Sequence, residues 1–267
     1  MEFDRKDFYT IDDLLKIVEM LRDKENGCEW DKLQTHNSIR QNFIEETYEA
    51  VDAIDKGDKE LLQEELGDVL LQVLLHSQFE KEEKSFDFSD VVDSLAQKLV
   101  LRHPHVFKNM ELNSVDEVLN KWEEIKNQSH GHNTISETLN AVPRSFPALM
   151  YTQKVQKRVA AGGVKVDSQQ EEIENIRGIL KDISLELEGG KASQETLGQL
   201  LFSSVSLVRQ NKMDAEEVLS RKSLDFVEIF NIFENLALQK GFEFGTIKSN
   251  EFIDLWQQAA ALVKTKK

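Results

Sequence analysis

Residues 55–74 read DKGDKELLQEELGDVLLQVL, and this stretch decides the fold. Its opening Asp-Lys-Gly-Asp tetrapeptide is a signal that stops one helix and starts the next. Apolar residues then return every three or four positions, as they do on the buried face of an α-helix. These residues are Leu61, Leu62, Leu66, Val69, Leu70, Val73 and Leu74. The stretch therefore predicts two helices joined by a tight turn, the second apolar enough for a bundle core.

The same periodicity extends on both sides of this stretch. It predicts helices over residues 11–21 and 43–54 before the turn, and over 88–102 and 115–126 after it. The third of these helices ends before Pro104, because the residue preceding a proline disfavours helical backbone. The chain has only three prolines, and alternating strand patterns are nearly absent. We therefore expect an all-α protein.

A weak internal repeat predicts two tandem modules. Residues 64–71, EELGDVLL, return as residues 195–202, ETLGQLLF, with the apolar positions retained and most of the charged ones changed. Between them lies a segment rich in Ser, His, Gly and Asn with two prolines, read as a linker; a long loop inside one domain is the alternative. The predicted parts are a first module at 1–127, a linker at 128–147 and a degenerate second module at 148–267.

Charge and cysteine content narrow the function classes. With 33 Lys and Arg against 49 Asp and Glu, the net charge of −16 repels the phosphate backbone, so bulk nucleic acid is not an expected partner. Cys28 stands alone and rules out an intrachain disulfide. The first residues lack an apolar signal core, and no uncharged apolar run approaches the roughly 18 residues of a membrane span. We expect a cytoplasmic protein that does not enter membranes.

Four carboxylates form the candidate metal site. Glu46 and Glu49 are three residues apart on one predicted helix, and Glu65 and Asp68 are three apart on the next, so each pair shares a helix face. If the helices pack antiparallel, the pairs meet near the core, where a divalent cation relieves their repulsion. Oxygen ligands suit Mg²⁺ or Mn²⁺. Surface glutamates on acidic helices are the alternative; a di-iron site is disfavoured because no Glu lies three residues before a His.

Basic and aromatic residues downstream suit a triphosphate. Lys98 and Arg102 are four residues apart on one predicted helix, as are Trp122 and Lys126 on the next. Ordinary exposed helix faces are the alternative for each pair. Beside a metal cluster, the cations would stabilise charge that develops on phosphate oxygens, and the indole would offer a stacking face.

Six motifs in order carry a family resemblance. They are NGCEWDKLQTH at 26–36, EETYE at 45–49, EELGD at 64–68, FDF at 86–88, RHPHVF at 102–107 and PRSFPAL at 143–149. Together they resemble the MazG-type nucleoside triphosphate pyrophosphohydrolases, strongly to about residue 157 and weakly after it. One departure is Glu29, where the family commonly has proline. The resemblance implies two tandem α-helical modules, a homodimer and Mg²⁺-dependent cleavage of nucleoside triphosphates to monophosphates and pyrophosphate.

The resemblance also assigns site residues. It implies that Glu46, Glu49, Glu65 and Asp68 bind the metal, and that Lys98, Arg102, Trp122 and Lys126 contact substrate. We expect a water to attack the α-phosphorus, with Glu45 as a further carboxylate able to assist as base.

The second module lacks most of these groups. Thr196 and Gln199 replace Glu65 and Asp68, and an uncertain helix alignment sets Asp182 and Leu185 against Glu46 and Glu49. At the positions of Lys98, Arg102 and Lys126 the second module has Asp225, Ile229 and Ala260. Trp256 matches Trp122. Chemistry is therefore expected in the first module. Two other classes stay open: a non-catalytic helical adaptor, and a nucleotide sensor without turnover.

Overall fold

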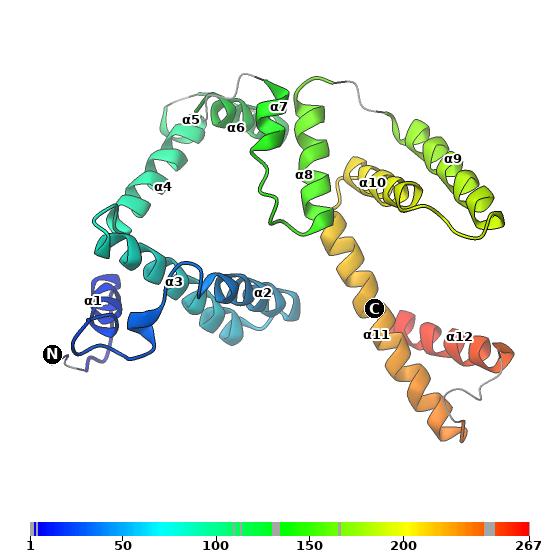
Figure 1. Ribbon diagram of the computed structural model, residues 1–267, viewed down its shortest axis with the longest axis horizontal. Helices are drawn as coiled ribbons and strands as arrows, with labels where there is room; N and C mark the ends of the chain where they lie inside the picture. Colours follow the sequence, from blue (N-terminus) through cyan, green and yellow to red (C-terminus); the bar gives the residue numbers. More distant parts are fainter. Residues whose placement is uncertain are drawn as a thin grey trace. The chain divides into compact units, whose positions relative to one another are not determined.

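The computed structural model describes residues 1–267 apart from 1–2, 4, 109, 113, 130–133, 165–166, 243–248 and 267. The described residues are helical and contain no strand, which confirms the all-α prediction. They divide into two compact units, Met1–Lys126 and Asn127–Lys267 (Figure 1). None of the helices that the structure describes combines the length and apolarity needed to cross a membrane.

The first unit is organised around one long helix. Its elements are α1 (Ile11–Leu21), η1 (Asp31–Leu33), α2 (Arg40–Lys56), α3 (Lys59–Glu82), α4 (Phe88–Arg102), α5 (Pro104–Phe107) and α6 (Val115–Ser129), the last extending past the unit boundary. The helix α3 packs against α1 and α2 and meets the start of α4. Its core consists of Val18, Ile39, Leu74, Leu75 and Phe79.

The predicted turn joins α2 to α3. Gly57 ends α2 in the left-handed conformation, with a φ of 67°, which a residue without a side chain adopts readily. Asp58 caps α3, and its carboxylate accepts hydrogen bonds from the backbone N–H groups of Glu60 and Leu61. Because only these two residues separate the helices, α2 folds back along α3 (Figure 1). This hairpin carries the candidate site.

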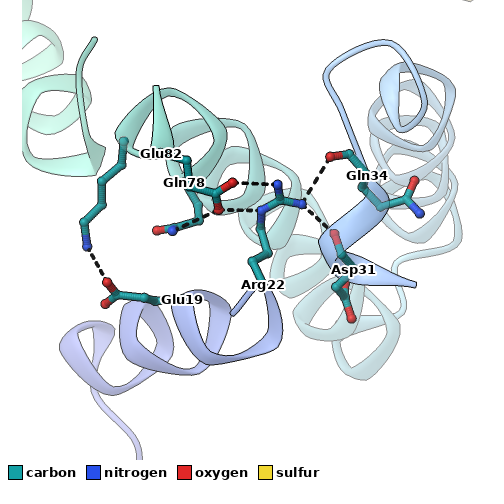
Figure 2. A network of polar contacts seen from close by, with 7 residues as sticks. Glu19, Arg22, Asp31, Gln34, Gln78 and Glu82 are labelled. Atoms are coloured by element: carbon teal, nitrogen blue, oxygen red, sulfur yellow. Dashed lines mark hydrogen bonds and ion pairs between the residues drawn. The ribbon is translucent and has the colours of Figure 1, made fainter. Parts of the chain in front are cut away.

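A buried arginine fastens the loop that precedes α2. Arg22, only 8% exposed, forms a bidentate ion pair with Glu82, from Nε to Oε1 at 2.7 Å and from Nη2 to Oε2 at 2.8 Å (Figure 2). Its Nη1 donates to the carbonyl oxygens of Asp31 and Gln34. The guanidinium also lies 4.1 Å from the centre of the Phe79 ring. One side chain thus ties α1, η1 and the end of α3 together.

The second unit contains two helix pairs. Its helices are α7 (Ile135–Asn140), α8 (Ala148–Ala161), α9 (Gln169–Glu188), α10 (Gln194–Gln210), α11 (Ala215–Gln239) and α12 (Ser249–Lys266). The α9–α10 pair packs on α8, and α11 pairs with α12 around Phe233, Ala237, Leu255 and Ala259. Part of the segment read as a linker, 130–133, lies outside the described residues. The rest includes α7, which a Thr134–Glu137 capping box begins and which packs on α8.

Candidate metal and phosphate site

Three of the four predicted metal ligands meet across the α2–α3 hairpin. Glu46 and Glu49 project from α2, and Glu65 projects from α3. Each offers a carboxylate oxygen, and these three oxygens lie within 4.8 Å of one another. Exposure differs among them: Glu65 is buried at 9%, Glu46 is half-buried and Glu49 is exposed. The cluster is therefore reached from solvent on one side and backed by the helix interface on the other.

Asp68 lies one turn after Glu65 and faces the same cluster. After burial, the negative charge of Asp68 raises the pKa of Glu46 more than the charge of Glu49 or Glu65 does. Asp68 falls outside the set of oxygens that are mutually within 4.8 Å. Glu45, the further carboxylate expected from the sequence, is exposed beside Glu46. The hairpin thus presents three converging carboxylates, with a fourth close enough to act on them.

Burial and mutual repulsion both mark this cluster. Burial raises the pKa of Glu46, and the charges of Asp68, Glu49 and Glu65 raise it further. Burial likewise raises the pKa of Glu65, followed by the charges of Glu49, Asp68 and Glu64. Within the part of the chain that the structure describes, no lysine or arginine forms an ion pair with the four predicted ligands. The negative charge is uncompensated.

A divalent cation fits this donor set. All the donors are carboxylate oxygens, which hard cations such as Mg²⁺ and Mn²⁺ prefer. Opposite ligands of an octahedral Mg²⁺ are roughly 4 Å apart, so oxygens within 4.8 Å need only a small shift to share one ion. A nearby positive charge would remove the repulsion that raises both pKa values.

The predicted basic and aromatic residues form a separate cluster in the first unit. The Arg102 guanidinium lies 5.2 Å from the centre of the Trp122 ring, and the Lys126 Nζ lies 4.9 Å from it. Lys98 lines an open hollow of about 820 Å³ along α4, together with Lys108. The helix α4 starts at the far end of α3 and leads away from the hairpin (Figure 1). Within one chain, the cations and the carboxylates are therefore gathered at two places.

A histidine pair that the sequence analysis does not identify joins α3 to the loop before α2. Nδ1 of His76 on α3 lies 2.7 Å from Nδ1 of His36, and the centres of the two stacked rings are 4.9 Å apart. His36 Nε2 lies 2.9 Å from a carboxylate oxygen of Glu80. Burial lowers the pKa of His76, and His36 lowers it further. A usable signal exists, because the two histidines lie at similar distances along the chain from the turn at Gly57.

In the second unit, the position that corresponds to Glu65 carries a hydrogen-bonded threonine. Thr196, the counterpart of Glu65, donates from its hydroxyl to Glu186 at 2.7 Å, and the backbone N–H of Ser193 donates to the same carboxylate at 2.6 Å. These hydrogen bonds lower the pKa of Glu186, the Ser193 bond most and the Thr196 bond next. The carboxylate that Thr196 contacts is thus Glu186, a residue outside the alignment of Asp182 and Leu185 with Glu46 and Glu49. A satisfied carboxylate replaces the repelling cluster.

Comparisons with known proteins agree with this geometry. The family model for the MazG nucleotide pyrophosphohydrolase domain matches residues 34–107, which include the whole α2–α3 hairpin. The chain is 38% identical over 260 residues to the nucleoside triphosphate pyrophosphohydrolase of Escherichia coli K12, covering 93% of this chain and 96% of that protein. It is 35% identical over 248 residues to the nucleoside triphosphate pyrophosphohydrolase/pyrophosphatase MazG of Thermotoga maritima, covering 93% and 94%. An uncharacterized protein of Bacillus subtilis, YabN, is 35% identical over 239 residues, which are 48% of its length.

Proposed function

Because the chain belongs to the MazG family of nucleotide pyrophosphohydrolases, we propose that it hydrolyses nucleoside triphosphates to monophosphates and pyrophosphate in its first unit. The observation that carries this assignment is the convergence of Glu46, Glu49 and Glu65 on one point of the hairpin. The second unit has Thr196 at the position of Glu65, and the residues of that unit that the structure describes lack this constellation. We assign the second unit a structural role, and place the protein in the cytoplasm with its substrates.

Glu46, Glu49, Glu65 and Asp68 would hold the metal, with Mg²⁺ as the physiological ion and Mn²⁺ as a substitute. A bound divalent ion supplies charge neutralisation for phosphate oxygens and lowers the pKa of a coordinated water. The exposed Glu45 can accept the proton that the attacking water loses. The water oxygen bonds to the α-phosphorus, the bond from that phosphorus to the bridging oxygen breaks, and pyrophosphate leaves.

The cationic cluster would bind the triphosphate. Arg102 and Lys126 both lie close to the Trp122 ring, so phosphate-binding cations and an aromatic ring are gathered at one place. Lys98 would add a further positive charge from α4. These cations lie apart from the carboxylates of their own chain. A complete site therefore needs cations and carboxylates from two different molecules.

A second copy of the chain is the partner we propose for this purpose. Apolar side chains on α2 are exposed beside the carboxylates: Ile44 at 43%, Tyr48 at 57%, Val51 at 47% and Ile54 at 59%. Another exposed apolar row follows α4, and includes Leu95 and Leu99. Exposed apolar faces of this kind are typical of surfaces that associate. In a two-fold dimer, α4 of one chain can lie against the hairpin of the other.

Product analysis tests the reaction. The full chain is incubated with dGTP or dTTP and Mg²⁺, and the products are resolved by anion exchange. Equal amounts of monophosphate and pyrophosphate are expected. Diphosphate with orthophosphate would refute the reaction class. Triphosphate binding without any product would favour a nucleotide sensor, and neither binding nor product would favour a helical adaptor.

A further inference from the structure

The second unit contains a cavity that the proposed reaction does not use. It has a volume of about 300 Å³ and lies among α8, α9 and α10, away from Glu186 and Thr196. Its size is at the lower end of the range for small-molecule sites. The residues that matter for its chemistry are Gln156, Val159, Glu172, Phe202, Ser206 and Arg209.

A buried carboxylate forms one part of its lining. Glu172 is only 6% exposed, and it accepts one hydrogen bond, from Nδ2 of Asn175 at 3.4 Å. No ion pair involves Glu172 within the residues that the structure describes. A charge at this depth is costly unless a cation or several donors face it. The cavity is the side from which such a donor can come.

An incompletely bonded guanidinium forms another part. Arg209 donates from Nε to Oε1 of Gln156 at 3.4 Å, and Gln156 is itself held by the carbonyl oxygen of Phe202 at 2.9 Å. In the described part of the unit, no carboxylate lies within ion-pairing distance of Arg209. The paired terminal nitrogens of the guanidinium remain available to a planar oxyanion.

The first unit shows how such an arginine is normally satisfied. There, Arg22 donates to both carboxylate oxygens of Glu82 through Nε and Nη2, and to two backbone carbonyl oxygens through Nη1 (Figure 2). The internal repeat places Arg209 at the position of Gln78, a neutral member of that network. The second unit has therefore gained a charge at this position, and the opposite charge of Glu172 borders the same cavity without pairing with it.

We propose that this cavity binds a free α-amino acid, with the carboxylate of the ligand on Arg209 and its ammonium group on Glu172. The charges of the wall and of such a zwitterion are complementary. A nucleoside triphosphate is a poor fit, because Glu172 and Asp167 both line the cavity and would repel a polyanion. Val159 and Phe202 offer an apolar wall to the side chain of the ligand.

Isothermal titration of the metal-free full chain with each of the twenty L-amino acids tests the proposal. At least one should give saturable heat with one site per chain and raise the thermal midpoint by about 5 °C near saturation. Arg209→Gln restores the residue type of the first unit and should weaken binding at least tenfold, as should Glu172→Gln. Arg177→Gln is the control, since Arg177 is an exposed arginine on α9.

The outcomes separate clearly. Binding that is lost in both cavity variants and kept in the control supports the site, provided that circular dichroism shows all variants folded. No heat with any amino acid, or equal binding by Glu172→Gln, overturns it. Equal stabilisation by acetate or lactate, which offer a carboxylate without an ammonium group, also overturns it. Since the titration needs no turnover, its result is independent of the reaction proposed for the first unit.

Discussion

Glu49 on α2 and Glu65 on α3 bring carboxylate oxygens to within 4.8 Å of each other across the hairpin interface. Residues separated by a two-residue turn and two helical stretches meet here because Gly57 reverses the chain. Uncharged neighbours would pack at this point without cost, whereas two carboxylates repel. Under the proposed function the pair is tolerated because it binds a cation, and its removal should affect metal binding and activity before it affects the fold.

Replacing Glu49 with Gln should lower kcat by at least about 100-fold, since losing even an outer partner of a metal ligand costs 10- to 100-fold. The side chain is exposed, so the fold should survive. Steady-state pyrophosphate release measures the effect. Glu64→Gln, an exposed neighbour on α3, is the control and should keep activity within a factor of about three. Full activity in Glu49→Gln would remove this residue from the site.

Metal-free stability should fall as the pH rises. The folded-state pKa values of Glu46 and Glu65 are raised above the ordinary value of 4.5. The folded state thus holds these protons more tightly than the unfolded chain, and this contribution is complete below pH 4.5 and lost as the pH rises through the raised values. Thermal unfolding in EDTA from pH 4 to 8 measures this trend.

Glu65→Gln supplies the matched comparison. In EDTA at pH 7.5 it should melt above the wild type, because one repelling charge is gone, and the difference should vanish near pH 4. With Mg²⁺ present, the wild type should gain stability and the variant should not. Equal stabilisation of both proteins by Mg²⁺ would place the ion elsewhere.

Histidine protonation should act in the opposite direction. His76 has a lowered pKa in the folded state and faces His36, whose other ring nitrogen meets Glu80. A second proton on this pair would set two N–H groups against each other. Stability from His76 is present above its ordinary pKa of 6.5 and lost as the pH falls through the lowered value. The midpoint of His76→Gln should change less between pH 7 and 5 than that of the wild type; equal slopes would contradict the assignment.

Local signals allowed much of the hairpin to be predicted. The turn at Gly57–Asp58 depends on residues that are adjacent in sequence, and the structure confirms it. The three-residue spacing that sets Glu46 and Glu49 on one helix face is likewise local. The His36–His76 contact depends instead on how the loop before α2 packs against α3, 40 residues further along the chain, and the sequence analysis does not predict it.

Loop length explains the remaining differences. In the second unit, the connection between α9 and α10 is longer than the Gly57–Asp58 turn, and Thr196 contacts Glu186, which the sequence analysis does not name. The α7 helix was hidden by the polar composition of its surroundings. Its Thr134–Glu137 capping box was the readable signal.

The Arg22 network should stabilise the first unit strongly. Arg22→Met removes a buried guanidinium and leaves Glu82 without its partner, and we expect a loss of about 3 kcal/mol in the free energy of unfolding. Although burial acts to raise the pKa of Glu82, hydrogen bonds from Arg22 and Gln78 hold it low. Urea denaturation in a Trp256→Phe background, followed by the fluorescence of Trp30 and Trp122, reports on this unit. The exposed pair Lys56–Asp52 on α2 of the same unit is the control, and Lys56→Met should cost less than about 0.5 kcal/mol.

Mixing two inactive variants tests whether the site is shared between copies of the chain. Glu49→Gln lacks a carboxylate and Arg102→Ala lacks a phosphate-binding cation, so each homodimer should be inactive. If the two clusters meet across a dimer interface, a mixed dimer has one site with both defects and one with neither. Random reassortment makes half of the dimers mixed, so activity should return to about a quarter of the wild-type value. Pyrophosphate release after co-refolding measures this recovery. A mixture that stays inactive, while sedimentation shows mixed dimers, would mean that both clusters of one site come from the same chain.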